Sequence, residues 1–569
     1  MVREEIKKLL ENSIKKLWAE KIFPKFDIPE IKLEHPEEKI HGDYSTNVAM
    51  MIAKQINKNS LEIAGNLKSK ILGAQPKAGR MWWVGCSLKS GLFDKVETAK
   101  PGFINFFLSK EYLQKQVEEI LKKGEKFDQL NIGKGKKVQV EFISANPTGP
   151  LTVGNARGGP FGDTLGNVLK KAGFKVEKAY HINDYGMQVL TLGHSVLKDS
   201  EAQYKGDYID YLHQIIKDED PYKAGQKAVK IIVEEMIKKT VDRMGIKYDE
   251  WSSEMEFHKS GAVDKALELL KKKELIYEKE GALWFKSSQF GDERDRVVVK
   301  ADGWKTYLAG DIAYHQYKFE KKKFDKVINI WGADHYGDVP GLQAIVTALG
   351  HKDKLDIILL QFVTLLEKGE KLKMSKRKGI YVTMDELLDK VGPDVVRFFF
   401  LQKSADTHLN FDLSLAKEQS EKNPVYYIQY AHARICSILQ KLKIKNQAFI
   451  YESEGKEEGK ALFAYEKLKT RIKNLGLLNH PSELALIKRL IQFPEIIEDT
   501  AKDYQVQRIP QYSVDLATVF HQFYRDCRVL PDLIEIRSLS EARLALVLAT
   551  KTILKNTLNL MGISAPEKM

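Results

Sequence analysis

The chain has 569 residues and a mass of 65.1 kDa, so typical domain sizes predict about three to four domains. The composition, 43% hydrophobic and 30% charged, is typical of a globular protein, and no run of ~18 apolar residues predicts a membrane span. Residues 1–20 are amphipathic and charged, unlike a signal peptide. Cys86, Cys436 and Cys527 lie too far apart to suggest a disulfide framework or a zinc site, which favours a reducing, cytoplasmic compartment.

The net charge of +13 and the pI near 9.1 arise from lysines and arginines spread along the whole chain. Such a balance favours a large polyanionic partner such as RNA or DNA, because neutralised phosphates release counterions. A generic lysine-rich surface is the alternative. Charge alone does not choose between the two interpretations.

Residues 1 to about 125 are predicted to form a small α+β domain. Helical periodicity in Glu5–Trp18 and Asn47–Leu72 flanks the turn-rich sequence HGDYST at His41–Thr46. The stretch Ala74–Lys100 has no clear period and is predicted to be an insertion or a long loop. The sequence FINFFL at Phe103–Leu108 then predicts a strand.

Residues 134–415 alternate strands and helices, the pattern of a parallel sheet covered by helices. The irregular, charged stretch at about 190–300, with helices over Lys223–Arg243 and Val263–Lys273, is predicted to be an insertion. After about residue 417 only helical stripes remain, as in Tyr426–Leu442 and Val514–Leu530, with Gln447–Glu458 as a polar linker. The predicted strands are Val138–Ile143, Val176–Ile182, Val327–Trp331 and Ile357–Leu366.

Two motifs in this order point to ATP chemistry. Residues 138–159, VQVEFISANPTGPLTVGNARGG, run a β-branched strand into a Pro/Gly-rich turn and then open a helix, whose free N–H groups can bind phosphate. The second motif, KMSKR at Lys373–Arg377, could close over the same triphosphate with its cations. By itself it also fits a solvated basic hairpin.

Six motifs in order make the chain resemble the class I arginyl-tRNA synthetases. They are EFISANPTGPL, TYLAGDIAYH, WGADHYGDVP, KMSKRKG, SADTHLNFD and NPVYYIQYAHARICSI, which begin at residues 141, 306, 331, 373, 404 and 423. The resemblance implies an α/β protein with a Rossmann-type parallel sheet. It implies an N-terminal domain for the tRNA elbow at 1–125, a catalytic domain at 126–420 and an all-α anticodon-binding domain at 421–569.

The first signature departs from the usual His-x-Gly-His, because Thr152, Val153, Gly154 and Asn155 stand there. Gly154 keeps the backbone open to a nucleotide base, and Thr152 and Asn155 can donate neutral hydrogen bonds to phosphate. The alternatives are that both residues only cap the helix, or that the chain is an inactive paralogue. The resemblance implies catalytic roles for Lys373, Lys376, Thr152 and Asn155. It implies ATP contacts from Pro147, Gly149, Leu151, Thr152, Gly154, Asn155, Met374, Ser375 and Lys376.

Arginine recognition demands carboxylates and a planar surface for a guanidinium with five donors. Tyr307 and Asp311 lie four residues apart and therefore on one helix face, and Glu141 lies near the end of the first predicted strand. By similarity to the family, Glu141, Tyr307 and Asp311 hold the arginine side chain, and Ser144 and Asn146 hold its polar head. Asp334 and His335 follow the strand VINIW and are expected in the same crevice, where His335 would also contact arginine.

The implied reaction uses ATP with Mg²⁺, without a dedicated protein metal site or organic cofactor, and passes arginine through an adenylate to tRNA(Arg). Expected tRNA contacts are Phe103 and Asn105, on what would be the exposed face of FINFFL beside Phe107, and Tyr430 and Arg434 in the helical domain. A cytoplasmic monomer without membrane contact is expected. Two alternatives stay open: a non-catalytic tRNA-binding paralogue, and a related nucleotidyl-transferring enzyme with a small-molecule substrate. The stretch Gln75–Phe93 receives no role.

Overall fold

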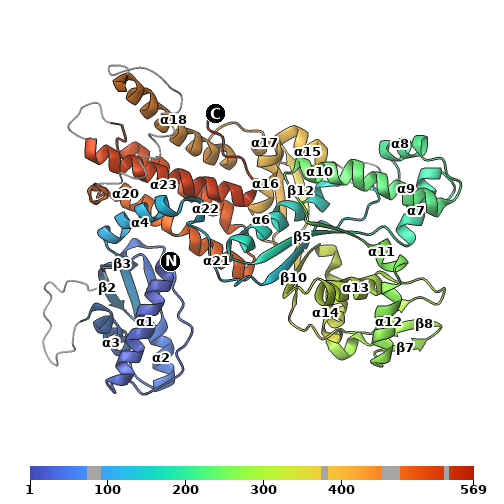
Figure 1. Cartoon of the computed structure of the whole chain (residues 1–569), viewed down its shortest axis with the longest axis horizontal. Helices are drawn as coiled ribbons and strands as arrows, with labels where there is room; N and C mark the ends of the chain where they lie inside the picture. Colours follow the sequence, from blue (N-terminus) through green and yellow to red (C-terminus); the bar gives the residue numbers. More distant parts are fainter. Residues whose placement is uncertain (74–90, 373–381, 451–473, 531–536) are drawn as a thin grey trace.

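The computed structural model of the chain describes residues 1–73, 91–372, 382–450, 474–530 and 537–569, with the side chains of 442–450 and residue 537 left aside. The N-terminal elements pack below the C-terminal helices, and the central sheet lies between those helices and a lobe formed by residues 254–321 and 339–348 (Figure 1). Within the described ranges, no helix has the length and apolar character needed to cross a bilayer.

The N-terminal part is an antiparallel sheet of order β1-β3-β2 packed against helices. The predicted first helix and the FINFFL strand are confirmed. Its elements are α1 (Val2–Ala19), β1 (Tyr44–Thr46), α2 (Val48–Ile56), α3 (Ser60–Leu72), β2 (Phe93–Ala99), β3 (Phe103–Leu108) and α4 (Lys110–Lys123).

Two N-terminal predictions are corrected. The single helical stretch Asn47–Leu72 is two helices, because Asn57 ends α2 in the left-handed region at φ 51° and the Asn59 side chain caps α3 by accepting from the Leu61 N–H at 2.9 Å. The predicted loop Ala74–Lys100 ends in strand β2, which pairs with β3; residues 74–90 lie outside the described part.

The central sheet is fully parallel and has the order β11-β10-β4-β5-β6. Apolar residues of β4 such as Val140 and Phe142 pack with α6, whereas α13 and α14 lie on the other face with Val327 of β10 (Figure 1). The elements are β4 (Lys137–Phe142), α6 (Gly158–Lys171), β5 (Lys175–Ile182), β6 (Glu250–Ser253), α13 (Tyr307–Gln316), β10 (Lys326–Gly332), α14 (Val339–Ala348) and β11 (Leu355–Leu360).

The structure corrects the predicted catalytic region at two places. The stretch 190–300, predicted to be wholly an insertion, contains β6, the edge strand of the central sheet. The predicted strand Ile357–Leu366 is two strands, because the Arg157 guanidinium donates to the Gln361 carbonyl where the chain leaves the sheet. The second piece, β12 (Val363–Glu367), forms a small sheet with β13 (Glu370–Lys371) and β14 (Leu409–Asp412).

Most other elements of residues 187–299 lie on the side of the sheet away from the C-terminal helices (Figure 1). The predicted helix Lys223–Arg243 is confirmed as a continuous helical run that contains a π-helical turn at Ile232–Ile237, and the predicted helix Val263–Lys273 is α12. The elements are α7 (Met187–Leu197), α8 (Asp207–Ile215), α9 (Pro221–Ile231), α10 (Lys238–Arg243), α11 (Glu254–Lys259), α12 (Ala262–Lys272), β7 (Ile276–Lys279), β8 (Ala282–Phe285) and β9 (Arg296–Val299).

The C-terminal part is helical, as predicted. Helix α18 continues to Ile450, into the predicted linker Gln447–Glu458, whose remainder lies outside the described residues. Helix α22 ends at Asp526, before the predicted Leu530. The elements from residue 384 onward are α15 (Met384–Val391), α16 (Pro393–Leu401), α17 (Leu413–Ala416), α18 (Pro424–Ile450), α20 (Pro481–Ile491), α21 (Phe493–Asp503), α22 (Arg508–Asp526) and α23 (Arg537–Met561).

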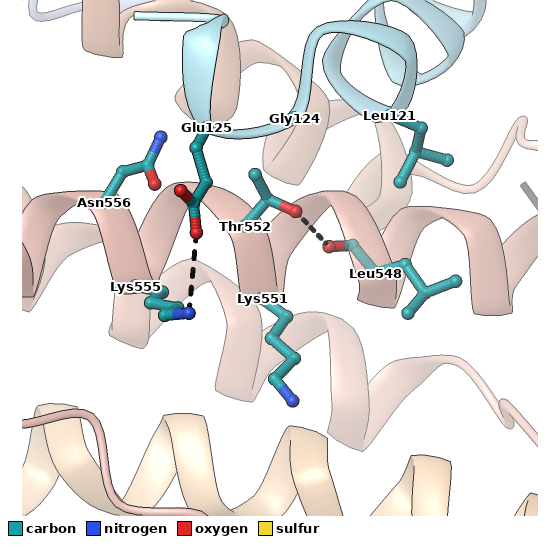
Figure 2. A pocket seen from close by; sticks show the side chains of 8 residues that line it. All are labelled: Leu121, Gly124, Glu125, Leu548, Lys551, Thr552, Lys555 and Asn556. Carbon is teal, nitrogen blue, oxygen red and sulfur yellow. Dashed lines mark hydrogen bonds and ion pairs between the residues drawn. The ribbon is translucent and has the colours of Figure 1, made fainter. Parts of the chain in front are cut away.

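The N-terminal and helical parts meet at buried Glu495 of α21. Its carboxylate accepts from the Tyr44 hydroxyl at 3.0 Å, the Arg3 backbone N–H at 3.1 Å and the His35 ring at 2.9 Å. Elsewhere between these parts, a hollow of about 310 Å³ lies between the end of α4 and α23, with Glu125 and Lys555 paired across it at 3.5 Å (Figure 2). Interdomain contact is therefore polar as well as apolar.

The buried Arg397 of α16 ties three segments together. Its guanidinium pairs with Asp163 of α6 and donates to the carbonyls of Met244, at 2.9 Å, and Met561. Gly562 packs so closely on this group that a Cβ would lie 2.4 Å from Arg397 Nη2. Arg397 thereby attaches the end of α23 to α6, the helix that packs on one face of the central sheet.

Candidate active site

The sheet has its topological switch point between β4 and β10. Strands β5 and β6 lie on one side of β4, whereas β10 and β11 lie on its other side. Ligands of open α/β sheets bind outside the carboxyl ends of the strands at such a point. Directly after β4, Ile143 and Ser144 adopt left-handed backbone angles, φ 66° and 37°. A β-branched residue is costly there, which is typical of backbone held in place at functional sites.

The first signature begins the helical turn α5 (Val153–Ala156) in front of this edge. Thr152 is its N-cap: Oγ1 accepts from the Asn155 backbone N–H at 3.4 Å and donates to Asn155 Oδ1 at 2.6 Å. Thr152 thus caps the helix, whereas Asn155 lies within its first turn and accepts from Thr152; phosphate binding by these two side chains stays a prediction. Gly154 is exposed, and among the described residues a Cβ there would have only Thr152 Oγ1 within 4 Å, at 3.9 Å.

The residues Lys373, Met374, Ser375 and Lys376 lie outside the described part of the chain. The segment that follows them is described, and it contacts the first signature directly. Thr383 forms an antiparallel bridge with Thr152, and the Met384 N–H donates to the Leu151 carbonyl at 2.8 Å. The residues that follow the second motif in the chain therefore lie against the first motif.

Glu141 lies near the end of β4 with its side chain on the α13 side of the sheet. It is only 6% exposed, accepts from Lys318 Nζ at 2.6 Å and from Ser144 Oγ at 3.2 Å, and lies opposite Asn329 of β10 in the strand register. Burial raises the pKa of this carboxyl, but Lys318 and the neighbouring His181 offset that effect and lower the pKa to about 2. Glu141 is ionised at neutral pH.

Tyr307 and Asp311 lie one turn apart on α13, which confirms their predicted common face. Burial raises the pKa of Asp311 to about 8, and the carboxylates of Glu254 and Glu141 add to the rise. Burial likewise raises the pKa of the Tyr307 hydroxyl to about 12, with Glu254 contributing. We find no hydrogen bond or ion pair to the Asp311 carboxylate within the described ranges.

The third carboxylate of the crevice, Glu254, begins α11 and was not predicted. It is 4% exposed and packs on α13, where a Cβ on Gly310 would lie 2.6 Å from its Oε1. Its Oε2 has no hydrogen-bond partner among the described residues, and its Oε1 lies 3.8 Å from His258 Nε2. Buried carboxylates without partners are costly, so the site fits a ligand with several N–H donors and a positive charge.

The other predicted arginine contacts line the same edge. Ser144 is engaged within the protein, because its Oγ also accepts from the His181 N–H at 3.0 Å. Asn146 is exposed, and its Oδ1 accepts from Asn183 Nδ2 at 2.8 Å. His335 lies in the turn after β10, half exposed and 3.2 Å from Asp338 Oδ2.

One of the predicted tRNA contacts is corrected. Asn105 is 3% exposed, because its Oδ1 accepts from Ser45 Oγ at 2.7 Å on the neighbouring strand; Phe103 and Phe107 beside it remain partly exposed. In the helical part, the Arg434 guanidinium lies between the rings of Tyr430 and Tyr524, 4.7 and 5.0 Å from their centroids. This partly exposed cluster offers planar surfaces and positive charge.

Comparison with known families covers nearly the whole chain. Residues 4–108 match the arginyl tRNA synthetase N terminal domain, residues 116–205 and 198–398 match the tRNA synthetases class I (R) catalytic domain, and residues 428–569 match the DALR anticodon binding domain. Among curated proteins, the chain is similar to the arginine–tRNA ligase of Caldanaerobacter subterraneus subsp. tengcongensis, with 41% identity over 100% of this chain and 99% of that protein. The arginine–tRNA ligase of Carboxydothermus hydrogenoformans is 43% identical over 95% of this chain and 94% of its own length.

Solved structures agree with these relationships. A putative arginyl tRNA synthetase from Campylobacter jejuni matches with a TM-score of 0.70 and 34% identity, covering 81% of this chain and 100% of that one. The Thermus thermophilus arginyl-tRNA synthetase, 22% identical, shares the fold with a TM-score of 0.73 over 100% of both chains. With its switch-point crevice, its three domains and these relatives, the chain belongs to the family of class I arginyl-tRNA synthetases.

Proposed function

We propose that the crevice at the carboxyl edge of the sheet activates L-arginine with ATP and transfers it to tRNA(Arg). A carboxylate oxygen of arginine attacks the α-phosphorus of ATP, the bond to pyrophosphate breaks, and arginyl-adenylate forms. The 2′-hydroxyl of the terminal tRNA adenosine then attacks the carbonyl carbon, and AMP leaves. Positioning and electrostatic stabilisation supply most of the rate in such a reaction.

The observation that carries the proposal is the unbalanced negative charge of the crevice. Glu141, Glu254 and Asp311 surround it, and Lys318 is the only lysine or arginine that pairs with any of them in the described part of the chain. A guanidinium brings one positive charge and five N–H donors, so it supplies the partners that these oxygens lack. The exposed ring of Tyr307 offers the planar surface beside them.

Nucleotide binding is assigned to the turn before α5 and to the second motif. Thr152 and Asn155 would turn their hydrogen bonds from each other to phosphate oxygens, and the backbone of Pro147, Gly149, Leu151 and Gly154 would approach the nucleotide. Lys373 and Lys376, with Met374 and Ser375, would meet the charge that develops on the leaving pyrophosphate. Mg²⁺ would arrive with ATP and bind its phosphates.

For tRNA, the cluster of Tyr430, Arg434 and Tyr524 supports stacking of unpaired anticodon bases. Phe103 and Phe107 remain candidates for the tRNA elbow, without Asn105. The net charge of +13 agrees with a large anionic partner. We propose that the protein acts as a monomer in the cytoplasm.

The decisive experiment measures capture of radiolabelled arginine on tRNA(Arg), with and without ATP. We expect ATP-dependent capture that unlabelled arginine suppresses and that citrulline, which lacks the charge, does not. Equal suppression of capture by unlabelled citrulline would contradict the charge argument. Binding of tRNA without capture at any ATP concentration would indicate a non-catalytic paralogue instead.

A further inference from the structure

Lys318 is the buried residue that the proposed reaction leaves without a role. It follows α13 at the start of a π-helical segment, Tyr317–Lys321, and its side chain is 0% exposed. π-helical turns occur frequently at functional sites, where they displace a side chain from the regular helical position. A lysine without solvent contact is rare unless its charge is paired.

The ammonium of Lys318 is directed at the two polar residues that lie opposite each other on β4 and β10. Nζ donates to Glu141 Oε2 at 2.6 Å and to Asn329 Oδ1 at 3.3 Å, and it lies 4.1 Å from the centroid of the Tyr314 ring. Because Oε2 faces the lysine, Oε1 of Glu141 is the oxygen turned to Ser144, the residue that begins the crevice wall.

A chain of hydrogen bonds continues from Asn329 back to the arginine side of α13. His315 Nδ1 is 2.9 Å from the Asp311 carbonyl and therefore carries the proton, so Nε2 accepts from Asn329 Nδ2 at 3.2 Å. This leaves Asn329 Oδ1 to accept from Lys318. In this series of hydrogen bonds each donor meets an acceptor. The series connects the Glu141 carboxylate, through Lys318, Asn329 and His315, to the backbone carbonyl of Asp311.

We infer that Lys318 is a positioning residue for arginine recognition: by donating to Oε2 of Glu141 it holds the carboxylate with Oε1 beside Ser144, on the side of the substrate, without touching the substrate itself. The inference rests on the proposed arginine-binding role of Glu141. Within the described ranges, the other titratable groups that interact with Glu141 are His181 of β5, stacked on Tyr314, then Tyr314, His315 and Asp311 of α13, and Tyr248. Burial lowers the pKa of His181 and, to about 3, that of His315, so neither imidazole can replace the lysine charge at neutral pH.

The test compares Lys318→Met with the wild-type enzyme in aminoacylation, with arginine and ATP varied separately between pH 6 and 9. We expect the KM for arginine to rise about tenfold or more, because truncating one partner of a buried charge pair leaves the other uncompensated, while the KM for ATP stays within about twofold. The added defect should be larger at pH 6 than at pH 9, because without the lysine charge the burial of Glu141 raises its pKa relative to the wild type. Lys318→Arg, which keeps the charge, should recover part of the loss.

A double-mutant cycle with Glu141→Gln keeps the inference testable if Lys318→Met alone does not fold. Removing both charges leaves no unpaired ion, so the double variant should fold, as circular dichroism would verify. If Lys318 acts only through Glu141, the double variant should match the KM for arginine of Glu141→Gln within about twofold.

The outcomes separate the two claims. A further rise of the arginine KM in the Glu141→Gln background would overturn the positioning role, as would an unchanged arginine KM and pH profile in folded Lys318→Met. An unchanged KM in Glu141→Gln itself would instead overturn the assignment of Glu141 to the arginine site.

Discussion

Replacing Asp311 with asparagine should stabilise the fold and remove arginine recognition at the same time. The pKa of Asp311 is raised from 3.8 to about 8, first by burial and then by Glu254 and Glu141. The unfolded chain therefore releases this proton near pH 4, whereas the folded chain keeps it until about pH 8. Across that window the folded state binds more protons, so the free energy of unfolding falls as pH rises.

The size of the effect follows from the shift. At about 1.4 kcal/mol for each pH unit, Asp311 costs the fold ~1.5 kcal/mol at pH 5 and ~5 kcal/mol at pH 8. Water reaches part of this side chain and screens the repulsion, so both values are upper limits. Asparagine has a similar shape and no charge, and Asp311→Asn should recover most of this free energy.

Thermal unfolding of both proteins between pH 5 and 8, without arginine, measures the effect. The difference in melting temperature should grow with pH, while Glu278→Gln, which changes an exposed carboxylate on β7, should give no such trend. In the wild type the KM for arginine should fall by roughly 50-fold from pH 6 to pH 8, as Asp311 ionises. A difference in melting temperature that does not vary with pH would refute the charge-repulsion argument.

Three further substitutions test other parts of the structure. Gly562→Ala should lower the free energy of unfolding by about 2–4 kcal/mol, because its Cβ would meet the buried Arg397 guanidinium. As a control, Gly350 also has a positive φ but has nothing within 4 Å of a Cβ, so Gly350→Ala should lower the free energy by only about 1 kcal/mol. Equal losses of the two variants in denaturant titrations would contradict this prediction. Thr152→Val should raise the KM for ATP and leave the KM for arginine unchanged, whereas Thr152→Ser, which keeps the hydroxyl, should behave like the wild type. Parallel changes in the KM for ATP and the KM for arginine would argue against a nucleotide role of Thr152. Glu495→Ala should expose the junction of the N-terminal and helical parts to limited proteolysis, and an unchanged cleavage pattern would show that apolar contacts suffice there.

Glu141, Tyr307 and Asp311 are the predicted site residues that local sequence rules place best. Glu141 lies near the end of the strand VQVEFI, and Tyr307 and Asp311 are four residues apart on one helix face. The convergence of these elements on one edge then follows from the parallel sheet. The order of the strands around β4 supplies the switch point that brings them together.

Lys318 and Glu254 could not be found in this way. In sequence, Lys318 is one of several lysines in KFEKKKFDK and is indistinguishable from a solvated charge until α13 is placed on the sheet. Glu254 follows a four-residue strand. In this region the apolar residues are spaced irregularly, so neither the helical nor the strand period could be recognised. The prediction that Asn105 is exposed was wrong for a related reason. The alternation of side chains along a strand assigns Asn105 to a face of the sheet but does not show that Ser45 covers it there.

The attachment of Arg397 to the end of α23 has a consequence for how the protein matures. On a ribosome, the central sheet emerges well before residue 561 is made, and until then the guanidinium lacks one of its carbonyl acceptors. A buried cation with an unfilled hydrogen bond destabilises its surroundings. The nascent catalytic region should therefore remain loosely folded until the last helix docks behind it, and only chains translated through that helix should acquire a rigid crevice.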